Sequence, residues 1–156
     1  MSKKSTSGGF GGSDYRQAAL ERLSEAQMLF MREYYGGGVY LAGRAVEGML
    51  RAVIWFRDAE IQQGKKSLET GHDLRQLLAA VRDLGLLGRH DDLETTVQTV
   101  GRLWSNNLRF ASSRYVETFW WGLGEVGKRR TMKQATAAYF DACHAIIKRC
   151  EPLCAR

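Results

Sequence analysis

Hydrophobic residues recur every three or four positions along most of the chain, which is the spacing of an amphipathic helix. The first such pattern covers residues 15–35 and the second covers residues 39–60. Three consecutive glycines, 36–38, lie between them. Because glycine disfavours the helical conformation, we expect the helix to break there. These segments therefore predict an antiparallel helical hairpin.

Two shorter helices are expected in the middle of the chain. Residues 74–84 place leucines and a valine at helical spacing, and residues 91–108 continue such a pattern through Trp104. Asp91 followed three residues later by Glu94 resembles a capping box, with Asp in place of the usual Ser or Thr. The second of these helices is expected to turn Trp104 toward the core.

The C-terminal third combines an unassigned segment with a final helix. Residues 115–131 are rich in aromatic and then in basic side chains, and we treat them as an aromatic and basic insert. Thr131 with Gln134 forms a second capping-box pattern, and helical spacing then continues to about Leu153. Since no strand-like alternation of useful length is visible, we predict an all-α fold, an antiparallel bundle of about five helices.

Composition favours one soluble domain. The chain has 156 residues, of which 44% are hydrophobic and 26% charged, the balance of an ordinary globular domain. Residues 1–14 are rich in Gly, Ser and Lys, which predicts a flexible tail ahead of a single domain at 15–156. Neither a signal peptide nor an apolar run of about 18 residues is visible. With three cysteines, an incomplete set for pairing, we expect a cytoplasmic protein.

The charge of the chain tilts the expected partners toward anions. Its formal net charge is +6 and its pI is about 9.4, which favours RNA, nucleotides or an acidic protein surface. One candidate group lies at the end of the fourth expected helix and consists of Arg102, Asn106, Asn107 and Arg109. Arg102 and Asn106 are four residues apart and would share a helix face, where guanidinium groups match phosphate. The alternative is a buried polar network that joins helices or subunits.

A second candidate group precedes the last helix. Lys128, Arg129 and Arg130 lie beside the expected helix start, where unpaired backbone N–H groups already favour anions. The alternative is a solvated basic loop. Upstream, Trp120 and Trp121 offer rigid faces that stack on bases or anchor an interface, although core packing explains them equally well.

Other patterns have simpler structural explanations. His72 with Asp73, and His90 with Asp91, resemble metal-binding dyads, but helix capping explains both aspartates. Glu47 lies in an apolar helix, and we expect it to pair with Arg44 or Arg51 on adjacent turns rather than to act in catalysis.

A further set of potential ligands lies on the last helix and consists of Cys143, His144, Cys150 and Cys154. Cys143 and Cys150 are two turns apart, too far for one tetrahedral ion, so we expect free thiols. Similarly, Gly122, Gly127 and Lys128 match a phosphate-binding loop, but Arg129 replaces its Ser or Thr and no strand precedes it. We therefore expect no metal and no cofactor.

Three blocks of sequence resemble HEPN domains. Residues 40–52, YLAGRAVEGMLRA, resemble the second-helix pattern of that family, in which a Tyr precedes a Glu, a Leu, a basic residue and an Ala. Residues 71–74, GHDL, resemble the His-x-Leu start of the family's third helix. Residues 103–110, LWSNNLRF, resemble its aromatic-x-x-x-x-Arg-Tyr block. The helix with Ala138, Tyr139, Ala142 and Ile146 would be the last helix of such a domain, so the resemblance spans about residues 15–153.

The resemblance implies a small helical domain that usually forms homodimers, here through the helices that carry residues 104–110. HEPN domains are found in bacterial toxin–antitoxin, antiviral defence and CRISPR-associated proteins, and many pair with a nucleotidyltransferase. The ribonuclease members use an Arg followed four to six residues later by a His. In this chain those positions hold Arg114, Tyr115 and Val116 after Arg109, and Asn107, Leu108 and Arg109 after Arg102. Neither set contains an imidazole to exchange a proton near pH 7.

We therefore expect a non-catalytic module that binds RNA, a nucleotide or a partner protein, such as a nucleotidyltransferase or another defence protein. Its contacts would come from Arg102, Asn106, Arg109 and the stretch 128–130. The alternative is a metal-independent ribonuclease toxin with a non-standard site, in which Arg109 stabilises the charge on the phosphorane and Arg102 or Arg114 assists. Whether the protein is an enzyme stays open at this point.

Overall fold

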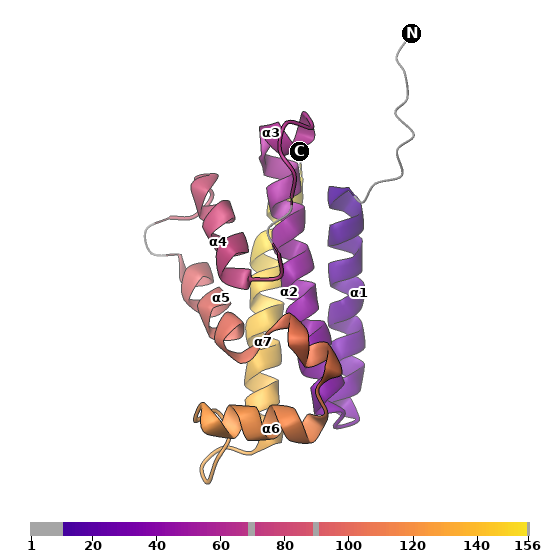
Figure 1. The fold of residues 1–156 in the computed structure, drawn as a ribbon, viewed down its shortest axis with the longest axis vertical. Coiled ribbons are helices and arrows are strands. Elements are labelled where there is room, and N and C mark those ends of the chain that lie inside the picture. The colour runs from indigo at the N-terminus through magenta and orange to yellow at the C-terminus, as the bar shows by residue number, and fades with distance from the viewer. Residues whose placement is uncertain (1–10, 69–70, 89–90, 156) are drawn as a thin grey trace.

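A computed structural model describes residues 11–68, 71–88 and 91–155 of the chain. Within these ranges the regular elements are helices, which confirms the predicted all-α bundle (Figure 1). The α-helices are α1 (Gly12–Met31), α2 (Tyr35–Arg57), α3 (Ala59–Gln62), α4 (Leu74–Asp83), α5 (Asp92–Leu103), α6 (Ser113–Gly122) and α7 (Met132–Cys150). Two 3-10 helices, η1 (Asn106–Phe110) and η2 (Glu151–Cys154), accompany them. The four-residue α3 and the unassigned segment that becomes α6 account for the difference from the expected five.

The predicted hairpin of α1 and α2 is confirmed, and α2 lies at the centre of the bundle with α1, α4 and α7 around it (Figure 1). Most of the α2 side chains are buried, including Val46, Met49 and Leu50. The predicted end of the tail at residue 14 is wrong, because α1 begins at Gly12 and Asp14 accepts a hydrogen bond from the Gly11 N–H at 2.8 Å. The rest of the predicted tail, residues 1–10, lies outside the described residues.

The prediction that glycines 36–38 break the helix is wrong. The chain turns earlier, at Glu33, which adopts a left-handed φ of 62°, and α2 begins at Tyr35 and contains all three glycines. Because these glycines have no side chain, neighbouring segments pack closely against this part of α2. A Cβ atom on Gly38 would lie 2.6 Å from the Phe30 ring, and one on Gly36 would lie 2.8 Å from the Ser113 backbone nitrogen.

The fourth expected helix also ends earlier than predicted. Helix α5 stops at Leu103, and Trp104 is extended with φ −127° and ψ 140°. The indole Nε1 of Trp104 donates a hydrogen bond to the Tyr40 carbonyl of α2 at 3.1 Å, which holds the buried ring against α2. Because this contact ends the helix, Arg102 and Asn106 do not share one helix face as the sequence suggested.

The first part of the unassigned segment, residues 115–122, belongs to α6, which crosses the end of the bundle (Figure 1). The Ser112 side chain caps this helix by accepting from the Tyr115 N–H at 3.1 Å. Trp120 is buried, and its Nε1 donates to the Leu103 carbonyl at 3.1 Å, whereas Trp121 is exposed. One of the two tryptophans therefore packs in the core and the other faces solvent.

Both predicted helix starts carry their caps. Thr131 and Gln134 form the reciprocal capping box, with hydrogen bonds of 3.2 and 2.9 Å. The Asp91 carboxylate accepts from the Leu93 N–H at 2.9 Å, and Arg149 lies 2.8 Å from it. These two contacts lower the pKa of Asp91. The capping box at this end is incomplete, because Glu94 pairs with Arg82 of α4 instead of turning back to the cap.

The three cysteines are buried free thiols, as expected. Burial raises the pKa of Cys150 to about 12 and that of Cys154 to about 11. Among the described residues, no three His, Cys, Asp or Glu side chains come together in a way that could hold a metal ion. None of the described helices is long and apolar enough to cross a membrane.

The contact between Trp104 and Gly43 yields a stability prediction. A Cβ atom on Gly43 would lie 2.2 Å from the Trp104 ring, so Gly43→Ala is expected to destabilise the fold by about 1–3 kcal/mol through overpacking. Gly101→Ala is the matched control, because the nearest atom to its Cβ would be 3.8 Å away. There the higher helix propensity of Ala should stabilise by up to about 1 kcal/mol. Urea unfolding of both variants measures the difference, and equal effects would contradict this packing.

Candidate nucleic-acid interface

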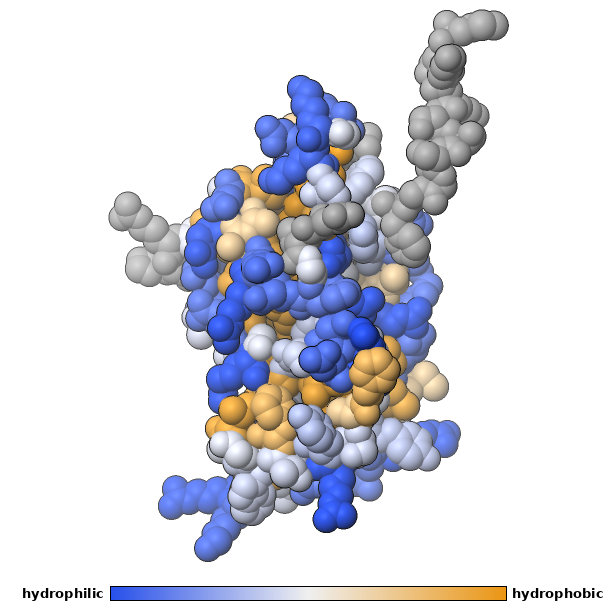
Figure 2. Space-filling model, viewed as in Figure 1, coloured by the Kyte–Doolittle hydropathy of each residue, from blue (hydrophilic) through white to orange (hydrophobic). Residues whose placement is uncertain are grey.

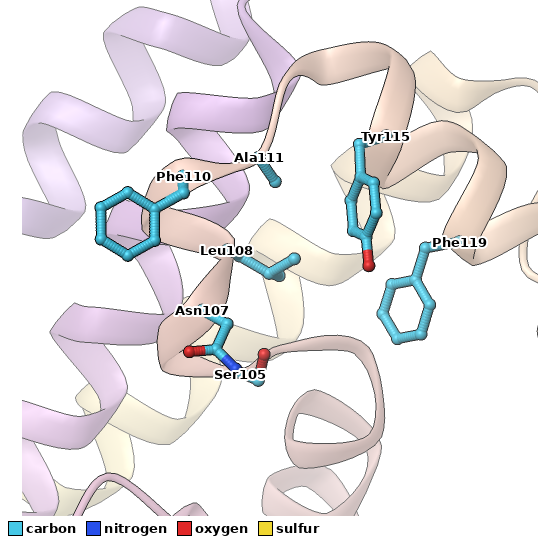
Figure 3. A pocket seen from close by; sticks show the side chains of 7 residues that line it. All are labelled: Ser105, Asn107, Leu108, Phe110, Ala111, Tyr115 and Phe119. Atoms are coloured by element: carbon cyan, nitrogen blue, oxygen red, sulfur yellow. The ribbon is translucent and has the colours of Figure 1, made fainter.

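A surface groove of about 330 Å³ lies between η1 and α6 (Figure 3). Its lining is mainly aromatic and polar and consists of Ser105, Asn107, Leu108, Phe110, Ala111, Tyr115 and Phe119. Tyr115 and Phe119 stand one turn apart on α6, and Leu108 points toward them from η1 (Figure 3). We call this feature the aromatic groove.

The local structure explains why these aromatic side chains face outward. On α6, Val116 and Trp120 point into the core, and the preceding positions, Tyr115 and Phe119, are rotated from them by about 100°. On η1, Leu108 is buried and Phe110 is 80% exposed, and on α6 Tyr115 is 59% exposed. Hydrophobic side chains reach the surface around η1 and α6, with polar side chains on either side (Figure 2). Exposed aromatic clusters of this kind mark binding surfaces.

A positive charge contacts one residue of the groove lining, Phe110, although it does not line the groove itself. The guanidinium carbon of Arg109 is 4.5 Å from the centroid of the Phe110 ring, within the range of a cation–π contact. Arg109 itself is exposed. The predicted candidate Asn107 lines the groove, while Asn106 is half-buried and does not. The structure therefore brings one predicted residue, Asn107, together with Tyr115 and Phe119 of the segment 115–131, and it places Arg109 over the neighbouring Phe110.

One arginine from each of the two predicted anion-binding groups forms an ion pair with the same carboxylate. Glu125, in the turn after α6, forms ion pairs with both Arg102 and Arg130, the latter at 3.4 Å. The sequence predicted the arginines but not this shared partner, which neutralises part of their charge. Lys128 and Arg129 are exposed and form no ion pair with the described residues.

The arginines of the ribonuclease alternative do not share a site. Arg114 lines a separate cavity of about 300 Å³ on α6, with Glu117, Thr118 and Trp121. Arg102 and Arg109 line neither that cavity nor the aromatic groove. Nor does a histidine line the groove: His72 lies in a different cleft, His144 stacks on Phe140, and His90 lies outside the described residues.

The cleft that contains His72 is lined by residues of α1 and α2 and holds a network of charged side chains, which the sequence indicated only in part. Buried Glu47 accepts from Arg44 at 2.7 Å and from Arg51 at 3.1 Å, which confirms the expected pairing within α2. His72 joins them, with its Nδ1 2.8 Å from Glu47 Oε1. Arg51 also donates to the carbonyl oxygens of Leu68, at 3.0 Å, and Gly71. The network therefore fastens the segment before α4 to α2.

Asp73 beside it acts as a helix cap, as predicted, and accepts from the Arg75 N–H at 2.9 Å. The sequence signal for the His72 contact was the Gly-His-Asp-Leu block at the start of α4. Nothing local to that block identifies Glu47, which lies 25 residues earlier in the chain.

Removing the charge of Glu47 tests this network. Glu47→Gln is expected to destabilise the protein by about 3 kcal/mol or more, because it leaves the largely buried guanidinium of Arg51 without its counter-ion. Glu94→Gln is the control, since its pair with Arg82 is solvent-exposed and worth at most about 1 kcal/mol. Urea denaturation monitored by circular dichroism measures both. Similar losses in the two variants would mean that the Glu47 network does not stabilise the fold.

Comparisons with known proteins leave the family of the chain open. No family model, no curated protein and no solved structure matches it. The helical bundle is therefore established by the structure alone, and the resemblance to HEPN domains stays a prediction based on the three short blocks at residues 40–52, 71–74 and 103–110.

Proposed function

We propose that this protein is a HEPN-like, non-catalytic module that binds single-stranded RNA in the aromatic groove. The observation that carries the proposal is the set of aromatic rings in the groove lining. Phe110 is largely exposed with Arg109 over it, and Tyr115 and Phe119 lie on the opposite side of η1 from the Phe110 ring (Figure 3). Single-stranded RNA presents unstacked bases, and proteins bind these by stacking them on aromatic rings while cations follow the phosphates.

The surrounding charges suit such a ligand. Arg109 at the groove, Arg114 on α6, and the exposed Lys128 and Arg129 in the next turn all lie on the segment from η1 to α7. An RNA strand whose bases occupy the groove would gain affinity from phosphate contacts with such side chains. The net charge of +6 acts in the same direction, because it favours encounter with a polyanion.

The side chains of the groove support the proposal of binding without cleavage. Its lining residues include neither a histidine nor a carboxylate to move a proton between the ribose hydroxyl and the leaving oxygen. Homodimerisation, a nucleotidyltransferase or other partner, and a place in a toxin–antitoxin or defence system are further parts of the proposal. They depend on the resemblance to HEPN domains.

The direct test is Phe110→Ala. Loss of one stacking platform, worth about 1–3 kcal/mol, should weaken binding of a fluorescent oligouridine by about fivefold or more. Phe110→Trp should retain binding, and Met28→Ala, which removes an exposed apolar side chain from α1, is the control. Fluorescence anisotropy at fixed salt measures each affinity.

Two outcomes would contradict this function. If the protein does not bind oligouridine, or binds it equally well after Phe110→Ala, the groove is not an RNA site. If the protein cleaves RNA and Arg109→Ala abolishes the cleavage, the non-catalytic assignment is wrong and the ribonuclease alternative is correct.

Glu125→Gln tests the contribution of the basic groups. It removes the carboxylate that pairs with Arg102 and Arg130, so both guanidinium groups become available to phosphates. Binding should tighten, and the slope of log Kd against log salt should steepen by about 0.7 for each additional phosphate that the protein neutralises. Glu94→Gln changes the net charge equally on α5 and should have a smaller effect. Equal effects would mean that only net charge matters and that these arginines do not contact RNA.

A further inference from the structure

A second cleft, of about 520 Å³, opens between α1 and α2 beside the segment that precedes α4. Tyr15 and Arg22 line it from α1, and Tyr40 and Arg44 line it from α2. Its floor includes buried Glu47, and His72 completes the wall. The aromatic groove shares no lining residue with this cleft.

The Glu47 carboxylate positions two polar groups at the cleft. Its Oε2 accepts from Arg44 Nη1 at 2.7 Å, and its Oε1 lies 2.8 Å from His72 Nδ1. Only 3% of the Glu47 side chain is exposed, against 37% for Arg44 and 50% for His72. The carboxylate engages one terminal nitrogen of Arg44 and one ring nitrogen of His72. The remaining guanidinium N–H groups of Arg44 are then available to a ligand. Because Nδ1 of His72 faces an acceptor, Nε2 on the other side of the imidazole donates to an anion when the ring carries both protons.

The charge of the lining favours an anion. Arg22, Arg44 and Arg51 line the cleft together with a single carboxylate, that of Glu47. Even with Arg22 paired to Glu25 outside the lining, the guanidinium groups of Arg44 and Arg51 exceed the one negative charge between them. Guanidinium groups match phosphate oxygens in geometry, and bonds between two charged groups are the stronger ones.

We propose that this cleft binds the phosphate group of a small phosphomonoester, with Arg44 and His72 as its direct contacts and Glu47 as the residue that positions both. The volume of the cleft falls within the range for small-molecule sites. The rings of Tyr15 and Tyr40 offer apolar surface for the remainder of the ligand, and the Tyr40 ring is itself stacked near Trp104, at 6.5 Å between centroids.

A titration of the full-length protein with inorganic phosphate tests the site without any mutation. Amide resonances in the nuclear magnetic resonance spectrum should shift in a saturable way for residues 40–51 and 71–73. The same ionic strength supplied as sodium chloride should leave these resonances unchanged. Shifts that never saturate, or that centre on residues 128–130, would overturn the proposal.

Two substitutions then separate ligand binding from a purely structural network. Arg44→Gln should weaken phosphate binding by about tenfold or more, since it removes a charged hydrogen-bond donor. Arg82→Gln is the matched control, because Arg82 is an exposed, ion-paired arginine outside the cleft. Phe110→Ala should not alter phosphate binding, so that failure of this site and failure of the RNA proposal are distinguishable. Unchanged phosphate affinity in folded Arg44→Gln protein would show that the network only fastens the chain.

Adenosine 5′-monophosphate and adenosine distinguish the source of the phosphate. If the monophosphate binds more tightly than inorganic phosphate, the ligand is a nucleotide-like ester. If the two bind equally, the cleft recognises the phosphate group alone. Both results support the proposal, whereas equal binding of adenosine and its monophosphate would overturn it.

Discussion

The packing of Trp104 against Gly43 determines how the C-terminal half of the chain surrounds α2. The indole lies so close to Gly43 that a single Cβ atom would overlap it, and its N–H group satisfies the carbonyl oxygen of Tyr40. Helix α5 ends where this side chain turns into the core, so the following residues form η1 as a separate element. Trp120 continues the arrangement from α6 by donating to the carbonyl oxygen of Leu103. Outside these two buried indoles, Phe110 and Tyr115 are exposed to solvent and Phe119 is half-buried.

Four arginines of the described part of the chain lie in three different electrostatic environments. Arg51 is largely buried and joins α2 to the segment before α4 through Glu47 and two carbonyl oxygens. Arg102 and Arg130 share an exposed pair with Glu125, where solvent screening weakens the attraction. Arg109 lies over an aromatic ring instead of beside a carboxylate. Guanidinium groups of the same charge therefore contribute differently to the stability of the fold, and the contribution of each depends on how far it is removed from solvent.

Helix α2 connects the two candidate sites. Its first turn contacts the start of α6, where the Gly36 N–H donates to the Ser113 hydroxyl at 2.9 Å. Its middle carries Glu47, Arg44 and Arg51, which line the second cleft, between α1 and α2. A rigid, buried central helix of this kind holds both surfaces in fixed positions, which suits sites that recognise a ligand by geometry.

By itself, the sequence determined the features that arise within a few residues of one another. Helical periodicity identified the hairpin, α4 and α7, the capping residues Asp91 and Thr131 marked helix starts, and spacing on one helix paired Glu47 with Arg44 and Arg51. Only the tertiary structure decided where α5 ends, because Trp104 reaches the distant Tyr40 carbonyl. It likewise decided that His72 joins Glu47 and that Glu125 joins Arg102, across 25 and 23 residues. Such contacts depend on how helices pack, and local periodicity carries no information about that packing.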